Sequence, residues 1–245
     1  MARADRPPES VSAGARAAEP FRSCGPGEPA VSGFLHRPAG GARDGLVVTH
    51  GAGGDANAPL LKALGAAFAA AGVAVLRVDL PFRQHRRKGP PSPSGAARDR
   101  EGLKRAADEM RRIVPGRVGL GGQSYGGRQA SMLAADVPGA ADVLVLLSYP
   151  LHPPGRPGDL RTAHFARLST PTLFAHGSLD PFGSLEDLDA ARALIPAPSE
   201  LLAIEGAGHG LGRGPRMPVP ADETVERLVA AVLSFIAAHA AARHG

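Results

Sequence analysis

Residues 118–128 read Val-Gly-Leu-Gly-Gly-Gln-Ser-Tyr-Gly-Gly-Arg, and this stretch decides the fold. A short apolar run ends at Gly121, and a stretch with helical spacing follows Ser124. Between them, the run from Gly122 to Gly126 matches G-x-S-x-G, typical of a sharp turn that exposes a nucleophilic serine above a sheet. The flanking glycines lack the Cβ atoms that would collide where strand and helix approach each other. Glycine makes up 32 of the 245 residues, so the position of the pattern between a strand and a helix gives it its weight.

Short apolar runs and longer helical patterns alternate on both sides of this turn. We expect strands at 30–35, 45–49, 73–78, 118–121, 142–148, 172–175 and 200–204. We expect helices at 59–71, 97–113, 124–135, 184–194 and 222–241. Buried strands that alternate with helices predict an α/β fold with a mostly parallel central sheet and helices on both faces. Such sheets bind ligands at the carboxyl ends of their strands, so the residues just after each strand are the site candidates.

The sequence predicts a disordered tail at 1–28 and one domain at 29–245. The tail is rich in Pro, Gly, Ala and charged residues and has no periodic apolar pattern. Hydrophobic residues make up 43% of the chain, which is enough for one substantial core. A length of 245 residues is common for a single α/β domain.

Charge and cysteine content argue against several kinds of partner. The formal net charge is +5, and much of the excess lies in residues 83–88, which we interpret as a solvated surface loop. No aromatic residue interleaves with this run, so we expect no nucleic-acid partner. Cys24 is the only cysteine, which excludes an intrachain disulfide and is typical of a reducing compartment. Residues 1–20 lack the apolar segment of a secretory signal, and the apolar run 229–241 is too short to span a bilayer. We therefore expect a cytoplasmic monomer or homodimer with no membrane partner.

Two side chains far from the serine complete a candidate catalytic set. His209 lies in a glycine-rich loop after the last predicted strand, where it can serve Ser124 as a base. Asp180 follows the preceding strand and is the candidate acid that orients the imidazole. Glu205 and Asp142 are rival acids, but each lies in or beside a predicted strand. The alternatives are a surface-loop histidine at His209 and a simple Asp-Pro turn at Asp180.

The segment His50-Gly51-Ala52-Gly53-Gly54-Asp55 follows another predicted strand and is of the H-G-x-G type. Such a loop supplies one backbone donor of an oxyanion hole, and the residue after the nucleophile supplies the other. We expect these donors to be Ala52 and Tyr125, with Gly51 and Gly53 as less favoured choices. His50 is expected to pack and form hydrogen bonds beneath the loop.

The same loop has a competing interpretation as a dinucleotide-binding turn. Residues 51–56 also fit G-x-G-x-x-A, and Asp79 ends the next strand, where an acid can bind a ribose. Against this, Asn57 and Pro59 delay the helix past the place where its N-terminus would meet a pyrophosphate. We therefore expect no cofactor, and no metal, because no H-E-x-x-H or C-x-x-C motif exists.

With these segments in view, the chain resembles the dienelactone-hydrolase-like branch of the α/β-hydrolases. More narrowly, it is similar to a hydrolase family that includes a mammalian testis-expressed protein and a subunit of a chromatin acetyltransferase complex. The resemblance covers roughly residues 30–240, and its matching segments are 49–55, 80–83, 121–128, 149–155 and 180–183. Segment 149–155, Tyr-Pro-Leu-His-Pro-Pro-Gly, is the most specific of them. The resemblance implies an α/β-hydrolase fold with a Ser–Asp–His triad.

The chain departs from these relatives beside the nucleophile. Relatives carry a basic residue and Met there, whereas this chain has Gln123 and Tyr125, and we expect the tyrosine ring to alter the acyl pocket. Dienelactone hydrolases use a cysteine nucleophile, so Ser124 argues against that reaction.

These features predict an esterase that transfers the acyl group of a small ester or thioester to water. About 22 residues separate Ser148 from Pro171, where many relatives insert a lid, so we expect an open site with little or no lid. Arg83, Arg128 and His152 are further candidates for binding substrate, and the arginines suit an anionic group, although solvated or ion-paired arginines are more common. The alternative from another class is a non-catalytic interaction module on the same fold.

Overall fold

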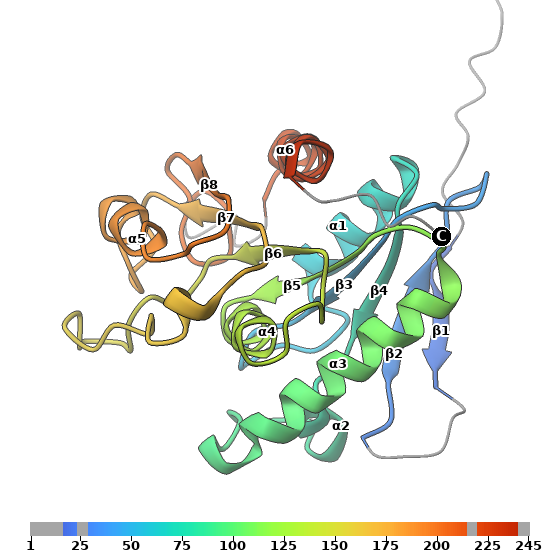
Figure 1. The fold of residues 1–245 in the computed structure, drawn as a ribbon, viewed down its shortest axis with the longest axis horizontal. Helices are drawn as coiled ribbons and strands as arrows, with labels where there is room; N and C mark the ends of the chain where they lie inside the picture. The colour runs from blue at the N-terminus through green and yellow to red at the C-terminus, as the bar shows by residue number, and fades with distance from the viewer. Residues whose placement is uncertain (1–16, 24–28, 215–219, 240–245) are drawn as a thin grey trace, which may run out of the picture.

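Eight strands form one sheet in the computed structural model, which describes residues 17–23, 29–214 and 220–239 (Figure 1). The strands are β1 (Glu19–Arg22), β2 (Ser32–His36), β3 (Gly45–Thr49), β4 (Ala74–Val78), β5 (Val118–Gln123), β6 (Val143–Leu147), β7 (Thr172–Gly177) and β8 (Ser199–Ile204). Their order across the sheet is β1-β2-β4-β3-β5-β6-β7-β8. The β1–β2 and β2–β4 pairs are antiparallel and all the others are parallel. The predicted mostly parallel sheet is confirmed.

Helices cover both faces of this sheet. They are α1 (Pro59–Ala70), α2 (Pro81–His85), α3 (Ala96–Ile113), α4 (Tyr125–Asp136), α5 (Leu185–Arg192) and α6 (Asp222–His239), with 3₁₀ turns at Pro93–Gly95 and Phe165–Arg167. In Figure 1, α3 and α4 lie on one side of the sheet, and α1 and α6 lie on the other. The first turn of α1 contains Pro59, whose fixed φ suits a helix start. The Ser184 side chain caps α5 by accepting a hydrogen bond from the Asp187 N–H at 3.0 Å.

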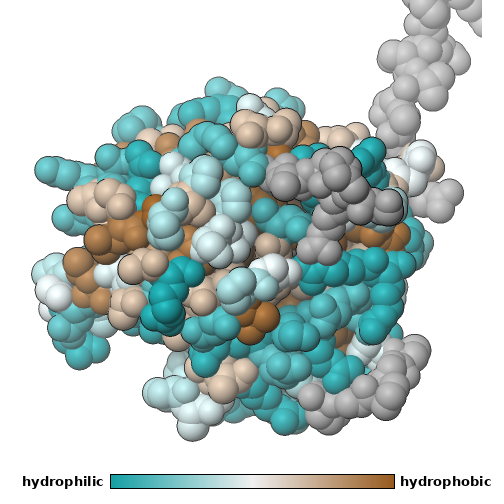
Figure 2. Space-filling model, in the orientation of Figure 1, coloured by the Kyte–Doolittle hydropathy of each residue, from teal (hydrophilic) through white to brown (hydrophobic). Residues whose placement is uncertain are grey.

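The central strands are buried on both faces, so their side chains alternate between two cores. In β3, Val47 packs in the core with α3 and α4, whereas Leu46 and Val48 pack in the core with α1 and α6. This burial on both faces explains why β3 is an unbroken apolar run rather than an alternating one. On the outer surface, hydrophilic side chains lie over α3, and a hydrophobic area lies on the side of α5 (Figure 2).

The topology creates a crevice between β3 and β5. The chain places β4 on one side of β3 and β5 on the other, and ligands of α/β sheets bind at such a switch point, outside the carboxyl ends of the strands. The loops after β3 and β5 meet there. A Cβ atom on Gly126 would lie 2.5 Å from the His50 carbonyl oxygen, so the two loops are in direct contact.

The predicted strands correspond to β2 through β8, with each boundary within two residues. The disordered tail predicted at 1–28 was wrong for Glu19–Arg22, which forms β1 at the edge of the sheet. Three of its four residues are exposed, so the strand has no apolar pattern that the sequence could reveal. The rest of that prediction, at 1–16 and 24–28, lies outside the described residues, as does Cys24.

The solvated loop predicted at 83–88 was also wrong at its start. Residues Pro81–His85 form α2, and Arg83 is only 7% exposed. The preceding Leu80 is fully buried and Pro81 begins the helix, so the segment is fixed to the core before the basic run begins. Among the described residues, no helix is both long and apolar enough to cross a bilayer.

Candidate active site

Ser124 lies at the sharp turn between β5 and α4. Its backbone has φ 51° and ψ −117°, and a non-glycine residue at positive φ costs about 1–3 kcal/mol. The surrounding structure fixes this conformation, because the Ser124 N–H donates to the Leu147 carbonyl of β6 at 2.8 Å. Glycine is required on both sides of the turn: a Cβ on Gly122 would lie 2.6 Å from the Thr49 carbonyl oxygen, and one on Gly126 would meet the His50 carbonyl. The turn therefore has the glycine-flanked geometry that the motif predicted.

Ser124, His209 and Asp180 form one continuous chain of hydrogen bonds. His209 Nε2 lies 2.8 Å from Ser124 Oγ, and His209 Nδ1 lies 2.8 Å from Asp180 Oδ2. These residues come from the loops after β5, β8 and β7, at the carboxyl edge of the sheet. The structure thus brings together the three side chains that sequence analysis singled out, and the rival acids Glu205 and Asp142 take no part in this chain.

Each member of this chain is held from outside. Asp180 is 7% exposed, and its second oxygen accepts a hydrogen bond from the Phe182 N–H at 2.9 Å. The Phe182 ring packs against the His209 imidazole with 4.3 Å between centroids. Gln123 donates from Nε2 to the His209 carbonyl at 3.1 Å, which ties the histidine loop to the nucleophile turn. Such support keeps reacting groups in a fixed geometry.

A second histidine, His176, lies beneath the acid. It lies in β7 next to the last residue of the strand, is fully buried, and its Nε2 lies 2.9 Å from the Gly183 carbonyl and 3.8 Å from Asp180 Oδ2. Burial lowers the pKa of His176 below its usual value, so the ring is neutral and donates to that carbonyl. His176 closes the loop that carries Asp180, a role that the sequence did not indicate.

The loop after β3 is fastened by His50, as predicted. The His50 ring is fully buried; its Nδ1 lies 2.8 Å from the Gly51 carbonyl, and its Nε2 accepts from the Leu80 N–H at 3.2 Å. Burial lowers the pKa of His50, so the neutral ring donates from Nδ1 and accepts at Nε2. The Asp79 carboxylate accepts from the Ala56 N–H at 2.7 Å. Asp79 is thus a structural partner of the loop, and this disfavours the dinucleotide alternative.

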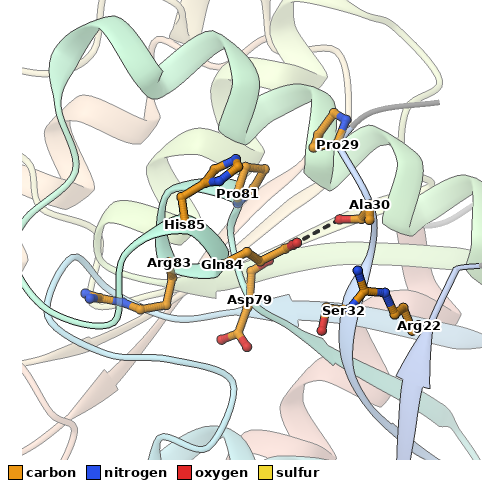
Figure 3. A pocket seen from close by; sticks show the side chains of 9 residues that line it. All are labelled: Arg22, Pro29, Ala30, Ser32, Asp79, Pro81, Arg83, Gln84 and His85. Carbon is orange, nitrogen blue, oxygen red and sulfur yellow. Dashed lines mark hydrogen bonds between the residues drawn. The ribbon is translucent and has the colours of Figure 1, made fainter.

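Arg83 was a candidate for binding substrate, and the structure gives it another position. Its Nε donates to the Gly54 carbonyl and its Nη2 to the Ala52 carbonyl, each at 2.8 Å, with further donation to the carbonyls of Arg86 and Gly89. Figure 3 shows its guanidinium extending away from Arg22, on the opposite side of a polar pocket. Arg83 therefore anchors the glycine loop by its carbonyl groups, which leaves the N–H of Ala52 free of this anchor.

A groove of about 810 Å³ opens in front of Ser124. It is lined by Ala52, Pro90, Pro91, Ser92, Pro93, Ser94, Ala96, Ala97, Arg100, Ser124, Tyr125, Arg128, Gln129, Met132, Pro150, Pro154, Arg161 and Phe182. Tyr125 is fixed in its wall, because its hydroxyl donates to the buried Asp99 at 2.7 Å. Burial, with the Asp99 carboxylate beside it, raises the Tyr125 pKa, so the hydroxyl stays protonated. The Tyr125 ring thus lies in the wall of the groove beside Ser124, and its effect on an acyl pocket stays a prediction.

The other substrate-binding candidates divide. Arg128 lines the groove, whereas His152 does not: it is buried, with Nδ1 2.9 Å from the Pro153 carbonyl. The chain turns the His152 ring back onto its own backbone, so this residue lies outside the groove. Sequence reasoning missed Arg161, which reaches the groove from the irregular segment between β6 and β7 and carried no motif. Among the described residues, no group of three or more His, Cys, Asp or Glu side chains could hold a metal ion.

Comparisons with known proteins agree with this architecture. A family model described as "Alpha/beta hydrolase domain" matches residues 42–237. A dienelactone hydrolase from Anabaena variabilis is similar, with a TM-score of 0.68, 20% identity, and coverage of 91% of this chain and 99% of that chain. An alpha-beta serine hydrolase homologue from Coxiella burnetii has a TM-score of 0.65, 21% identity, and coverage of 87% and 97%. An alpha/beta hydrolase, GrgF, from a Penicillium species has a TM-score of 0.66, 16% identity, and coverage of 91% and 98%. The predicted fold class is confirmed.

Proposed function

Because the chain belongs to the alpha/beta hydrolase domain family, we propose that it is a serine hydrolase that cleaves carboxylic esters or thioesters by acyl transfer to water. The observation that carries this proposal is the unbroken chain of hydrogen bonds from Ser124 Oγ through His209 to Asp180. An imidazole in this position can take the serine proton while the carboxylate stabilises the imidazolium that forms. The strained, partly exposed turn at Ser124 supports the same role.

The reaction proceeds in two halves. In the first, Ser124 Oγ attacks the carbonyl carbon, His209 takes the hydroxyl proton, and the tetrahedral intermediate collapses as His209 gives that proton to the leaving group. In the second, His209 takes a proton from water, the hydroxide attacks the acyl-Ser124 ester, and His209 returns the proton to Ser124 as the acid leaves. Asp180 keeps its negative charge throughout and holds the imidazole in one orientation.

The oxyanion hole of this reaction is formed by the backbone N–H groups of Tyr125 and Ala52. Tyr125 begins α4, and the first N–H groups of a helix have no partner inside it. Ala52 lines the same groove as Ser124, and Arg83 holds the Ala52 carbonyl. Gly51 and Gly53 are less favoured donors. Preorganised donors of this kind are worth about 10²–10³ in kcat each.

A fluorophosphonate probe tests the nucleophile. We expect covalent labelling of the protein that disappears in Ser124→Ala and falls strongly in His209→Ala. Ser234→Ala is the matched control, because Ser234 is an exposed serine of α6 far along the chain, and its labelling stays at the wild-type level. Intact mass spectrometry reads the adduct and circular dichroism confirms the fold. A folded wild-type protein that takes no label contradicts the proposal and favours the non-catalytic module.

The substrate class follows from the openness of the groove. The segment between β6 and β7 contributes only part of one wall, and no separate lid domain appears among the described elements. We therefore expect short acyl chains to be preferred, and thioesters to be accepted alongside esters. A series of 4-nitrophenyl esters with acyl chains of increasing length measures this preference, and a strong preference for long chains contradicts it. Membership of the narrower branch with the testis-expressed protein stays a prediction from segment 149–155.

A further inference from the structure

The groove in front of Ser124 carries cationic side chains and no acidic one. Arg100, Arg128 and Arg161 line it, and none of its other lining residues is Asp or Glu. Arg100 is already engaged, because its Nη1 donates to Gln129 Oε1 at 3.1 Å and its Nε lies 4.0 Å from an oxygen of Asp136. Among the described residues, the groove arginines that form no ion pair are Arg128 and Arg161.

Neither of these two guanidinium groups has a carboxylate partner within the part of the chain that the structure describes. The ion pairs of the described residues involve other arginines, such as Arg117, Arg156 and Arg167. Arg128 Nε is buried and has no hydrogen-bond acceptor. The Arg161 guanidinium makes one long contact of 3.5 Å to the Pro150 carbonyl. A buried donor without an acceptor is destabilising, more so when it is charged, so an external acceptor would be favoured here.

The two arginines are also held close to each other and to the nucleophile. Arg128 is one helical turn from Ser124 in α4, and its N–H donates to the Ser124 carbonyl at 2.9 Å, so both side chains share one side of the helix. The backbone of Arg161 is fixed at both its polar groups: its N–H donates to the Leu151 carbonyl and its carbonyl accepts from the Tyr149 hydroxyl, each at 2.7 Å. Burial lowers the pKa of Arg161, and the nearby positive charge of Arg128 lowers it further.

We propose that Arg128 and Arg161 bind an oxyanion carried by the substrate, so that Ser124 acts on an ester or thioester with a carboxylate or phosphate elsewhere in the molecule. Planar guanidinium groups match such oxygens with two parallel hydrogen bonds, and an anion between two cations relieves their repulsion. The groove supplies no competing negative charge. This inference rests on the proposed hydrolase function for its chemistry, but the anion site itself stands on the arginine geometry alone.

Kinetics with a matched pair of esters test this inference. The pair is 4-nitrophenyl hydrogen glutarate, with a free carboxylate, and its methyl ester, which has nearly the same length and no charge. We expect wild-type kcat/KM to favour the charged ester by about tenfold or more, chiefly through KM, as one good charged contact allows. Arg128→Met and Arg161→Met each reduce this ratio several-fold and the double variant brings it to about one. Arg128→Lys keeps part of the preference because it keeps the charge.

Arg100→Met is the matched control, since it removes a groove arginine that already has partners, and we expect it to keep the ratio. A wild-type enzyme that cleaves both esters with a ratio at or below one overturns the inference and leaves the hydrolase proposal standing. If neither ester is cleaved, the hydrolase proposal fails, and isothermal titration of the full chain with glutarate and with inorganic phosphate still tests the anion site. Binding of either anion that is lost in the double variant supports the site, and no binding of either overturns it.

Discussion

Two groups of polar side chains around the groove are built in opposite ways. In the catalytic set of Ser124, His209 and Asp180, the side chains are satisfied inside the protein, as far as the Phe182 N–H. In the arginine pair of Arg128 and Arg161, neither guanidinium has an acidic partner among the described residues, and one nitrogen is buried without an acceptor. The difference teaches that a site can be complete for chemistry and incomplete for recognition. The catalytic set can act on any acyl group, whereas the arginine pair selects substrates that carry an anionic group.

The largest effect on kcat is expected from a substitution of Asp180, the acid of the catalytic set. Asp180→Asn keeps the size of the side chain and an acceptor for the Phe182 N–H, but it removes the charge that orients the imidazole and stabilises the imidazolium. We expect kcat to fall by about 10³–10⁴-fold with little change in KM or in the fold. Steady-state hydrolysis of 4-nitrophenyl acetate measures kcat, and thermal unfolding followed by circular dichroism checks stability.

Glu205→Gln is the control for this substitution. Glu205 is an exposed rival acid in the same loop as His209, and it makes no contact in the hydrogen-bonded chain. Its loss is expected to change kcat by less than about twofold, within the range of ordinary surface substitutions. If Asp180→Asn retains activity within tenfold while Glu205→Gln loses it, the orienting acid has been assigned to the wrong residue.

A smaller effect on kcat is expected from a substitution of Arg83, which anchors the glycine loop after β3 beside the catalytic set. Arg83→Met keeps the aliphatic stem but removes the donors that hold the carbonyls of Ala52 and Gly54. The glycine loop then loses its fixed position, and we expect kcat to fall by about 10–100-fold, less than the loss of a whole oxyanion donor. Hydrolysis of the neutral glutarate methyl ester measures this fall.

Arg83→Met also distinguishes the role of the catalytic set from that of the arginine pair. Because Arg83 contacts backbone carbonyls rather than substrate, Arg83→Met lowers kcat for the charged and the neutral ester alike, and their ratio is unchanged. Arg128→Met gives the opposite pattern, with an altered ratio and a near-normal kcat for the neutral ester. If Arg83→Met changes the ratio of kcat/KM for the charged and the neutral ester, Arg83 binds the anionic group of the substrate. The contrast between the catalytic set and the arginine pair would then be wrong.

The sequence predicted the catalytic set better than the arginine pair. Buried parallel strands appear as continuous apolar runs, and the residues of the Ser–His–Asp chain each follow such a run, so their meeting at one edge of the sheet could be inferred. Edge strand β1 was missed because it is short and largely exposed, and α2 was missed because its five residues begin a basic run.

Side-chain partners of irregular segments had no comparable signal. Arg83 binds backbone carbonyls, and a carbonyl is present at every residue, so no motif distinguishes an arginine of this kind from a solvated one. Arg161 reaches the groove through the path of the segment between β6 and β7, which the pattern of apolar residues does not determine. His152 looked equivalent in the sequence, but its ring turns to the Pro153 carbonyl.

The smallest expected effect is on the pH dependence of stability, and it comes from a buried histidine beside the arginine pair. His164 is 6% exposed, its Nε2 lies 2.8 Å from Ser131 Oγ, and burial, with Arg128 nearby, lowers its pKa to about 4. In the unfolded chain the pKa is about 6.5. Below that pH the unfolded state binds a proton that the folded state does not, so stability is complete above about pH 6.5 and is lost as the pH falls toward 4.

Urea unfolding at pH 7.5 and pH 5 measures this loss, and His164→Gln is expected to reduce it by about 1–2 kcal/mol. His36 provides the comparison, because burial and the neighbouring Arg77 also lower its pKa to about 4, and it packs against α1 at Gly65, on the other face of the sheet from α4. We expect His36→Gln to reduce the pH dependence in the same way and to leave glutarate binding unchanged. If His164→Gln leaves the pH dependence as in the wild type, a proton is not excluded from the ring beside Arg128. A protonated His164 would then add to the positive charge of the arginine pair.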